Sequence, residues 1–510
     1  MSETPLANDR SPTTRAAWPW ALLPAALAVA MVAPALTSGT FVNDPASVLR
    51  NPVVSTWRNL PVIFSRSFMI HTDGQYRPMS YGLLAVVRTW VSADHTVFWH
   101  AWLAAFHALG AMLVFLLVMH FSRKTWAALV AGCLFAVHPM TVLYTSHMNT
   151  FVYVLAGTLY LATLFAYFRF VRSRRPATFV LALVLFASGL VTSKMLLTLP
   201  ALLVLYEVLY EREGLWAGLR RLVPLGVCVL AAAPLRLWLT PHPMFFSYPL
   251  FPAGSEAYSA WTFLGRTGVH LQGVLAGYGF EAPLDERTRW ILGVGDERFL
   301  SALGWGALLI AALAASTVLL WRRRWAGLCV PLALVSVTPY ASTLFHCSRA
   351  IISWDYLYVG VASVALGAGA TASTASRLRS VRARRLVATA IVLLVVGFGV
   401  MHVRAGLRTR SAEDYWQHVL RVNPDSSTAS VELGKAALER GDLETALGYL
   451  FAPRVRNTYR SSLAMMGWYD VDNQPLAAAL HFNSAPAVQP DEVHAQNDFF
   501  MTAARLVYRA

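Results

Sequence analysis

Long apolar runs separated by short polar segments fill roughly the first 400 residues of the chain. A helix needs about 20 apolar residues to cross the hydrocarbon core of a bilayer, and eleven of the runs approach that length. We expect membrane-spanning helices near residues 17–37, 98–121, 125–141, 147–168, 177–193, 195–211, 222–239, 299–321, 325–345, 354–374 and 386–403. The first run lacks a small-residue cleavage site, so it reads as a retained helix rather than a signal peptide. The pattern therefore predicts an all-α fold, a polytopic membrane helix bundle.

The composition agrees with a membrane protein and excludes several other classes. Of the 510 residues, 56% are apolar and only 14% are charged, whereas a soluble domain carries roughly a quarter charged residues. An ordinary soluble enzyme and a disordered chain are both excluded. The four cysteines lie far apart, so a disulfide-stapled secreted fold is excluded and we expect them to pack as small hydrophobic residues.

The formal net charge of +15 is concentrated in short basic clusters between the apolar runs. The clusters fall at every second boundary, at residues 10–15, 123–124, 169–175, 212–221, 322–324 and 377–385. With eleven spans all of them lie on one face, which the positive-inside rule makes cytoplasmic. We therefore expect a bacterial inner-membrane protein with a cytoplasmic N-terminus and a periplasmic C-terminal domain. Because the basic clusters are explained by the orientation of the helices in the membrane, a nucleic-acid partner is disfavoured.

The predicted topology divides the chain into a cytoplasmic tail, a transmembrane domain and an extracytoplasmic domain, at 1–16, 17–403 and 404–510. Two outer loops, 38–97 and 240–298, are too long for simple turns, and loops of this length usually carry function. In the first loop Ile63, Phe64 and Phe68 can share one helical face. This stretch is either an amphipathic helix on the membrane surface or a loop packed on the bundle.

The C-terminal domain is polar and contains an internal repeat. The pattern that begins at Leu433-Gly434 and ends at Pro453 recurs 33 residues later, from Met466-Gly467 to Pro486. Small residues where two helices cross and a final proline are typical of a helix–turn–helix solenoid unit, similar to the tetratricopeptide repeat. Two such units are too few for an independent solenoid. We therefore expect the tail to dock on the membrane domain or on a protein partner.

Candidate chemistry is confined to polar residues at the outer ends of the spans. The sequence has no Gly-rich phosphate loop, no zinc-ligand spacing and no Gly-x-Ser-x-Gly elbow. Asp44, which precedes a proline, is either a helix N-cap or a general base at the membrane surface. Arg77, which follows Tyr76, can hold a phosphate bidentately or extend to lipid headgroups.

The later spans carry six further candidates at their outer ends: His138, His147, Asn149, Lys194, Arg349 and Asp355. Lone histidines at helix ends are commonly satisfied interfacial residues. Lys194 stands alone between two apolar helices on the face opposite the basic clusters, where a cation needs an anionic partner. An ion pair between Arg349 and Asp355 is the simplest explanation of those two residues.

One carboxylate and several cations on the outer face of a large bundle suit transfer from a lipid-anchored donor. A polyprenyl-phosphate sugar cannot leave the bilayer, so its headgroup must be met at the membrane surface. There a base activates the acceptor hydroxyl while cations stabilise the departing phosphate. We expect the polyprenyl chain to lie among the middle spans. No cofactor is expected, and a divalent metal stays open because it would need several oxygen ligands.

Several short motifs occur in the same order as in a known family. Residues 41–44 correspond to its first-loop acidic motif, residues 76–79 to its Tyr-Arg-Pro-Leu and residues 135–139 to its Phe-Ala-Val-His-Pro. Residues 193–194 with 205–207 correspond to its Ser-Lys-Glu and Leu-Tyr-Asp, and residues 355–358 to its late Arg-Tyr-Leu-Tyr. With this topology and tail, the chain resembles the C-type glycosyltransferases. The resemblance is greatest to the transmembrane and tetratricopeptide-repeat O-mannosyltransferase-like proteins, including their bacterial members.

The resemblance implies an inverting transfer of mannose or a similar sugar from polyprenyl phosphate. The acceptor would be a protein Ser or Thr hydroxyl, or another glycan or lipid of the cell envelope. The resemblance makes Asp44 the base and makes Arg77, His138 and Lys194 candidates for holding the donor phosphate, with Tyr76 beside them.

The chain also departs from the family pattern. Asn149 stands where the family has an aspartate, Met195 where it has a glutamate, and Asp355 where it has an arginine. These departures leave open an alternative from another class. The chain would then be a catalytically inactive membrane scaffold that binds an envelope partner through residues 404–510.

Overall fold

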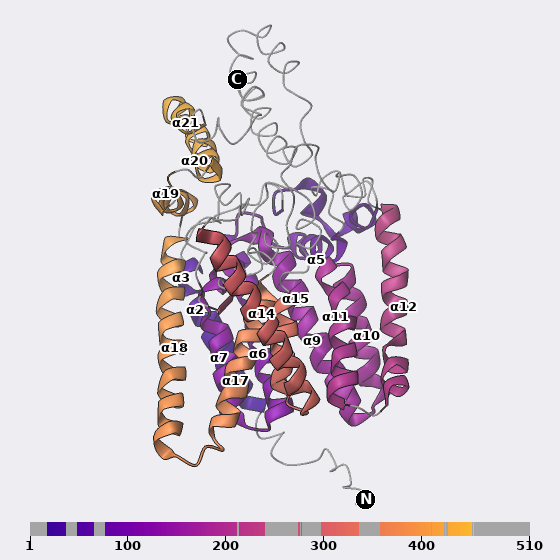
Figure 1. The fold of residues 1–510 in the computed structure, drawn as a ribbon. Helices are drawn as coiled ribbons and strands as arrows, with labels where there is room; N and C mark the ends of the chain where they lie inside the picture. Colours follow the sequence, from indigo (N-terminus) through magenta and orange to yellow (C-terminus); the bar gives the residue numbers. More distant parts are fainter. Residues whose placement is uncertain are drawn as a thin grey trace, which may run out of the picture.

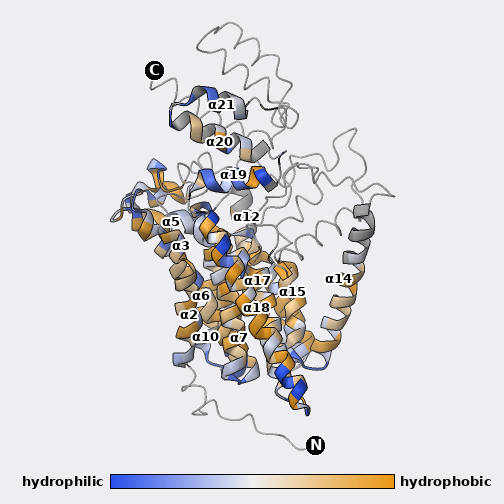
Figure 2. Ribbon diagram, turned by 90° about the vertical axis from the view of Figure 1, so that its left-hand side faces the viewer, coloured by the Kyte–Doolittle hydropathy of each residue, from blue (hydrophilic) through white to orange (hydrophobic). Residues whose placement is uncertain are grey.

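The computed structural model describes residues 18–36, 48–65, 77–211, 214–239, 274–275, 277, 297–335, 357–409, 411–422, 424, 427–450 and 452. All regular secondary structure within these residues is helical, which confirms the all-α fold. Figure 1 shows the long helices packed side by side in one bundle, with the short helices that follow residue 411 beyond one of its ends. Hydrophobic residues cover most of the bundle in Figure 2, as expected for helices in a membrane.

Helices lie in every apolar run that the sequence predicts to cross the membrane. In chain order they are α2 (Leu22–Met31), α3 (Ala33–Leu36), α6 (Thr96–Ser122), α7 (Thr125–Val137), α9 (Phe151–Ser173), α10 (Pro176–Leu190), α11 (Leu199–Leu205), α12 (Leu215–Leu239), α14 (Glu297–Trp321), α15 (Cys329–Val335), α17 (Tyr358–Ala375) and α18 (Val381–Arg408). Within the described residues, 4 helices are long and apolar enough to cross a membrane, and a bent pair, Thr125–Val137 with Pro139–Ser146, would make a fifth span. The polytopic membrane bundle is confirmed, and the number eleven stays a prediction.

Short elements connect the long helices and build the segments outside them. Those before α6 are η1 (Trp18–Ala21), η2 (Pro52–Ser55), η3 (Trp57–Asn59), α4 (Leu60–Ile63) and α5 (Pro78–Arg88). Those after α7 are η5 (Pro139–Thr141), α8 (Val142–Ser146), η6 (Met148–Thr150), η7 (Lys194–Thr198), η8 (Tyr206–Glu211) and η10 (Trp325–Leu328). The helices of the tail are α19 (Ala412–Val422), α20 (Ser427–Glu439) and α21 (Leu443–Leu450). The element η8 is a π-helical turn, a conformation that is rare in proteins.

The turns that follow α6, α9, α14 and α17 meet at one end of the bundle, which we call the basic end. Lys124 Nζ donates to the backbone carbonyl of Ser373 at 2.7 Å, and Arg172 Nη1 donates to the carbonyl of His120 at 3.4 Å. These contacts join the turn after α6 to the ends of α17 and α9. Figure 2 shows hydrophilic residues gathered at these turns. The sequence predicts this end to be cytoplasmic.

Three helices that reach the basic end finish with an arginine in the left-handed conformation. Arg123, Arg174 and Arg323 follow α6, α9 and α14 with φ of 56°, 54° and 53°. Glycine is the usual residue there, because a Cβ atom costs about 1–2 kcal/mol in this conformation. Arginine instead places a cation beside the helix carbonyls and the negative end of the helix dipole.

The bundle core is packed around the ring of Tyr358, at the start of α17. A Cβ atom added to Gly110 of α6 or to Gly157 of α9 would lie 2.3 Å from an atom of this ring system. Glycine at both positions therefore lets α6 and α9 close on the tyrosine. The Tyr358 hydroxyl also lies 3.3 Å from Nδ1 of the buried His107. Within the Tyr-Leu-Tyr stretch of the late motif, this tyrosine is a core residue.

The first outer loop packs on the bundle where the structure describes it. The helix α4 is a single turn, Ile63 is fully buried, and Phe64 is exposed. A Cβ atom added to Gly82 of α5 would lie 3.2 Å from Leu60 and 3.3 Å from Phe64. The described residues 61–65 therefore pack on the bundle through Ile63 and expose Val62 and Phe64, so the surface helix and the packed loop both stay predictions. Phe68 lies outside the described residues.

The C-terminal domain begins as a continuation of the bundle. The helix α18 extends to Arg408, past the predicted boundary at residue 403, and α19 follows at Ala412. Tyr415 and Trp416 of α19 are buried within the main hydrophobic cluster of the bundle. The first helix of the tail is thus docked on the membrane domain.

The helices α20 and α21 pack together as a hairpin. Gly441, with φ of 79°, makes the turn, and Asp442 Oδ1 accepts a hydrogen bond from the backbone N–H of Thr445 at 3.1 Å. The hairpin occupies the first predicted helix–turn–helix unit. The second unit, which ends at Pro486, lies outside the described residues, so the repeat assignment stays a prediction.

Candidate functional site

Two predicted site residues, His138 and His147, stand at the two ends of a segment that breaks the helix begun by α7. The chain bends by 52° between Thr125–Val137 and Pro139–Ser146. His138 has an extended backbone, with φ of −61° and ψ of 127°, because the following proline disfavours the helical conformation before it. A second extended residue, His147, ends α8. Residues 138–148 are all buried, so the break places irregular backbone inside the end of the bundle.

His138 has hydrogen-bond partners at both ring nitrogens. Its Nε2 lies 2.8 Å from the carbonyl oxygen of Val274, and its Nδ1 accepts a hydrogen bond from the backbone N–H of Met140 at 3.3 Å. This pair of contacts selects the neutral tautomer with its proton on Nε2. In this arrangement His138 anchors the second outer loop. A contact with the donor phosphate, as predicted, would require Nε2 to exchange its partner.

Gly277 completes the contact between the second outer loop and the helix break. Its φ is 69°, a conformation that favours glycine, and an added Cβ atom would lie 2.2 Å from Cγ of Pro139. The second outer loop therefore contacts both residues of the His-Pro step: Val274 bonds to the ring of His138, and Gly277 packs against the ring of Pro139.

The helix α18 supports the other side of the break. The carbonyl oxygen of His138 accepts a hydrogen bond from Thr141 Oγ1 at 2.6 Å and lies 3.2 Å from Nδ1 of His402. Ser146 Oγ and Thr409 Oγ1 are 3.1 Å apart. Side chains thus satisfy backbone groups that the broken helix cannot, and this fixes the break in place.

Arg77 meets α9 at the N-terminus of α5. Its Nη2 donates to the hydroxyl of Tyr153 at 3.0 Å, and its guanidinium carbon lies 5.0 Å from the centre of the Tyr153 ring. The tyrosine is buried, whereas Arg77 is partly exposed. The hydroxyl and the ring of Tyr153 thus hold the guanidinium in place. Because Arg77 is also the N-cap of α5, the backbone N–H groups and the dipole of that helix favour an anion at the same place.

Asn149 lies on η6, directly before α9 and four residues before Tyr153 in the sequence. Asn149 is exposed, although Met148 and Thr150 on either side are buried. An exposed amide thus precedes the helix whose tyrosine holds Arg77, and an amide can hydrogen-bond to a sugar hydroxyl or to a phosphate.

The first outer loop reaches the same end of α9. Val48, the fourth residue after Asp44 in the sequence, is buried in a cluster with Met148 and Phe151. The carbonyl oxygen of the next residue accepts a hydrogen bond from Arg88 Nε at 2.9 Å, which fixes this part of the loop on α5.

The other described candidates come from separate elements. The ring of His147 is buried and packs edge-on against Tyr415 of α19, with ring centres 5.8 Å apart. Lys194 begins η7 and is partly exposed, and Ser193 before it caps this turn by accepting a hydrogen bond from the backbone N–H of Met195 at 3.3 Å. The helix α9 contacts both α5 and η7, the elements at whose starts Arg77 and Lys194 lie.

Four predicted site residues, Asp44, Tyr76, Arg349 and Asp355, lie outside the described residues. Their roles stay predictions. Among the residues that the structure describes, no group of three or more His, Cys, Asp or Glu side chains could hold a metal ion.

Three polar residues of this region are absent from the sequence-based set: Tyr153, His107 and His402. The two histidines stand inside predicted spans, and a titratable residue within an apolar run is itself a signal of a specific role. Tyr153 offers no comparable signal, because its importance depends on a contact with Arg77, 76 positions away.

No protein-family model matches the chain, and no curated protein matches it significantly. Among solved structures, the chain is similar to ArnT from Cupriavidus metallidurans bound to undecaprenyl phosphate. The identity is 11% and the TM-score is 0.37, over 86% of this chain and 85% of that chain. The function of this chain therefore has to be inferred from its own residues.

Proposed function

We propose that this chain is an integral membrane glycosyltransferase of the C-type class. It transfers a mannose-like sugar from a polyprenyl-phosphate donor to a hydroxyl acceptor on the outer face of the membrane. The observation that carries this proposal is the Arg77–Tyr153 pair at the N-terminus of α5. A guanidinium held by a phenol, beside the positive end of a helix, is suited to a phosphate at the membrane surface.

In the proposed reaction the carboxylate of Asp44 takes the proton of the acceptor hydroxyl. The acceptor oxygen then attacks the anomeric carbon, the bond from that carbon to the phosphate oxygen breaks, and the configuration inverts. The polyprenyl phosphate leaves with the charge that Arg77 stabilises. Lys194, on the η7 turn that also contacts α9, would supply a second cation, and the Asn149 amide can bind a sugar hydroxyl.

The orientation and the acceptor follow from the same proposal. Convergence of the basic turns at one end supports a cytoplasmic location for that end, with Arg77 and the tail on the periplasmic side of a bacterial inner membrane. The docked helix α19 holds α20 and α21 beyond the end of the bundle that carries Arg77 (Figure 1). They can present a protein partner or a protein acceptor there.

The test is sugar transfer by the purified full-length protein in nanodiscs, with labelled polyprenyl-phosphate mannose as the first donor. Asp44→Asn should abolish transfer, and Arg77→Gln should lower its rate by about 100-fold, as loss of one charge-stabilising donor does in other enzymes. Arg58→Gln is the matched control, because Arg58 is an exposed arginine of the first outer loop. Its rate should equal that of the wild type.

Two outcomes would contradict the proposal. Equal rates of sugar transfer by Arg77→Gln and Arg58→Gln would show that the donor phosphate does not bind at the N-terminus of α5. Absence of transfer by folded wild type from every labelled polyprenyl-phosphate donor would favour the inactive scaffold, for which the docked tail would then be the functional part.

A further inference from the structure

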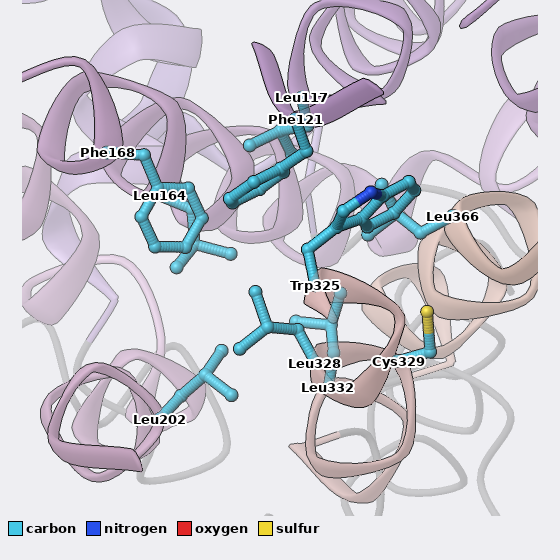
Figure 3. A pocket seen from close by; sticks show the side chains of 10 residues that line it. All are labelled: Leu117, Phe121, Leu164, Phe168, Leu202, Trp325, Leu328, Cys329, Leu332 and Leu366. Carbon is cyan, nitrogen blue, oxygen red and sulfur yellow. The ribbon is translucent and has the colours of Figure 1, made fainter. Parts of the chain in front are cut away.

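An apolar cavity inside the bundle is too small to bind a ligand. Figure 3 shows its lining, which consists of hydrophobic side chains from α6, α9, α11, η10, α15 and α17. The volume of this cavity is about 20 Å³, little more than one water molecule needs, and apolar cavities stay dry. It is therefore a gap in the packing and not a binding site.

A larger cavity opens at the basic end, between the first half of α18 and the helices α7 and α17. We call it the α18 groove, and its volume is about 200 Å³. Trp126 lines it from the start of α7, and Ala375 and Ser376 line it from the end of α17. Trp126 and Ser376 are exposed, so the groove opens to the surface. An engineered apolar cavity of about 150 Å³ already holds a benzene molecule, so the α18 groove has room for a hydrocarbon segment.

The α18 groove exists because α18 packs on the bundle mainly through its second half. Phe398, in that half, is buried with Leu134 and Val137 of α7. In the most apolar stretch of α18 only 11% of the residues are buried, against 72% for α17. Four residues in the first half of α18 lie at positions i, i+3, i+4 and i+7, which share one face of a helix. This face lines the groove with Arg384, Val387, Ala388 and Ile391.

The wall opposite α18 is held together by Lys124, which directly precedes α7. Its Nζ donates to the carbonyl oxygen of Ser373 at 2.7 Å and to the hydroxyl of Ser376. These hydrogen bonds join the start of α7 to the end of α17. The groove therefore has one fixed wall, and the ammonium group of Lys124 is bound within the protein.

The rim of the α18 groove is positively charged. Arg384 belongs to a cluster of five arginines between residues 377 and 385, and all five are exposed. None of them forms an ion pair with any residue that the structure describes. The helices α7, α17 and α18 contain no acidic residue. The positive-inside rule accounts for the arginines but not for a cavity beside them, so the groove presents an apolar surface next to cations that can bind an anion.

The order of residues along the α18 groove matches an amphiphile that enters from the basic end. From Arg384 to Ile391 the groove follows α18 for about 10 Å, at the rise of a helix. The cationic residue thus lies at the outer end of the groove, and the aliphatic residues lie deeper among the helices. Trp126, the second residue of α7, also lines the groove, and tryptophan is enriched where the membrane meets water.

The charge of the rim selects between the possible occupants. A second copy of this chain would bring the same arginines against the first, and like charges repel. A basic pocket between helices on the cytoplasmic side of a membrane protein is a common site for anionic lipid headgroups.

We propose that the α18 groove binds one anionic phospholipid from the leaflet beside the basic end. The phosphate of the lipid lies at Arg384, and the first part of an acyl chain lies along Val387, Ala388 and Ile391. This site is separate from the proposed sugar-transfer site and does not depend on it, because the donor phosphate would meet Arg77 at the other end of the bundle.

The test is a titration of phosphatidylglycerol onto the full-length protein in detergent, with bound lipid counted by native mass spectrometry. Arg384→Gln should weaken phosphatidylglycerol binding about fivefold, the effect of one basic residue near an anionic lipid surface. Ala388→Trp should abolish binding, because the indole fills the groove. Both residues are exposed, so neither substitution should unfold the protein.

Each of these variants has a matched control on α18. Arg385→Gln removes the same charge from the next residue, and Ala390→Trp adds the same indole at another alanine. Both control residues are exposed and neither lines the groove. Both control variants should bind phosphatidylglycerol nearly as the wild type does.

Four outcomes would overturn the proposal. The first is equal binding of phosphatidylcholine and phosphatidylglycerol by the wild type, and the second is an equal loss of binding in a variant and its matched control. Tighter binding of polyprenyl phosphate would assign the groove to that lipid instead. A dimer of the wild type that Ala388→Trp dissociates would assign it to a second copy of the chain.

Discussion

Breaking the buried ion pair of η8 should destabilise the protein far more than replacing both of its members. The side chains of Arg221 and Glu207 are only 11% and 1% exposed, and Tyr167 donates a further hydrogen bond to the carboxylate. Arg221→Met leaves a buried carboxylate with the phenol alone, a change that costs about 3–5 kcal/mol. The double variant Glu207→Leu with Arg221→Met removes both charges, and such replacements are neutral or stabilising by roughly 1–4 kcal/mol.

The measurement is the stability of the purified full-length protein against denaturant and heat in a mild detergent. Arg220→Met is the matched control, because this neighbouring arginine of α12 is exposed. It should change the free energy of unfolding by no more than about 0.5 kcal/mol. The reasoning would be refuted if Arg221→Met behaved like Arg220→Met, or if the double variant were less stable than Arg221→Met.

Three smaller predictions test other contacts. Gly277→Ala meets both a positive φ and Pro139, so limited proteolysis should cut the second outer loop faster than in the wild type, and unchanged cleavage would contradict the docking. Tyr153→Phe keeps the ring beneath Arg77 but removes the hydrogen bond, so sugar transfer should fall less than in Arg77→Gln; an equal fall would assign the whole effect to the hydroxyl. Hydrogen bonds from the side chain and then from the backbone N–H of Thr445 lower the pKa of Asp442 below 3.8. The stability that they give α21 is therefore present above about pH 4 and lost as the pH falls through the lowered pKa. Circular dichroism should follow this loss of helix in the wild type and not in Asp442→Asn.

The helical skeleton could be predicted from the sequence because it depends on local properties. The runs of apolar residues predict α6 closely, over 98–121 against Thr96–Ser122, since each run must satisfy its own backbone hydrogen bonds in lipid. The bounds predicted for α9 and α18, 147–168 and 386–403, differ more from Phe151–Ser173 and Val381–Arg408. The stop before Pro139 also follows from one residue. By contrast, the first outer loop could not be decided from the pattern, because the same spacing of Ile63 and Phe64 serves a surface helix and a packed loop.

The roles of the motif residues were harder to predict, because they depend on contacts between distant parts of the chain. His138 was proposed for the donor phosphate, but its ring bonds to Val274, 136 positions later. Tyr358 and Glu207 stand in motifs that resemble an enzyme family, yet the first fills the core between two glycines and the second closes a buried ion pair. A residue in a motif that resembles a family can therefore have a structural role in the fold and no role in catalysis.

The arginines at the end opposite the basic end differ in their hydrogen-bond and ion-pair partners. Positive charge there opposes the topology that the basic clusters favour, so each cation should have a structural or a functional reason to be present. Arg88 donates to the carbonyl oxygens of Leu49 and Val91, and Arg50 pairs with Asp94 at 3.1 Å; both fix the first outer loop. Arg77 differs, because its guanidinium bonds to a phenol and lies at the N-terminus of α5. The backbone N–H groups and the dipole of that helix favour an anion there, which supports Arg77, rather than its neighbours, as the proposed phosphate-binding residue.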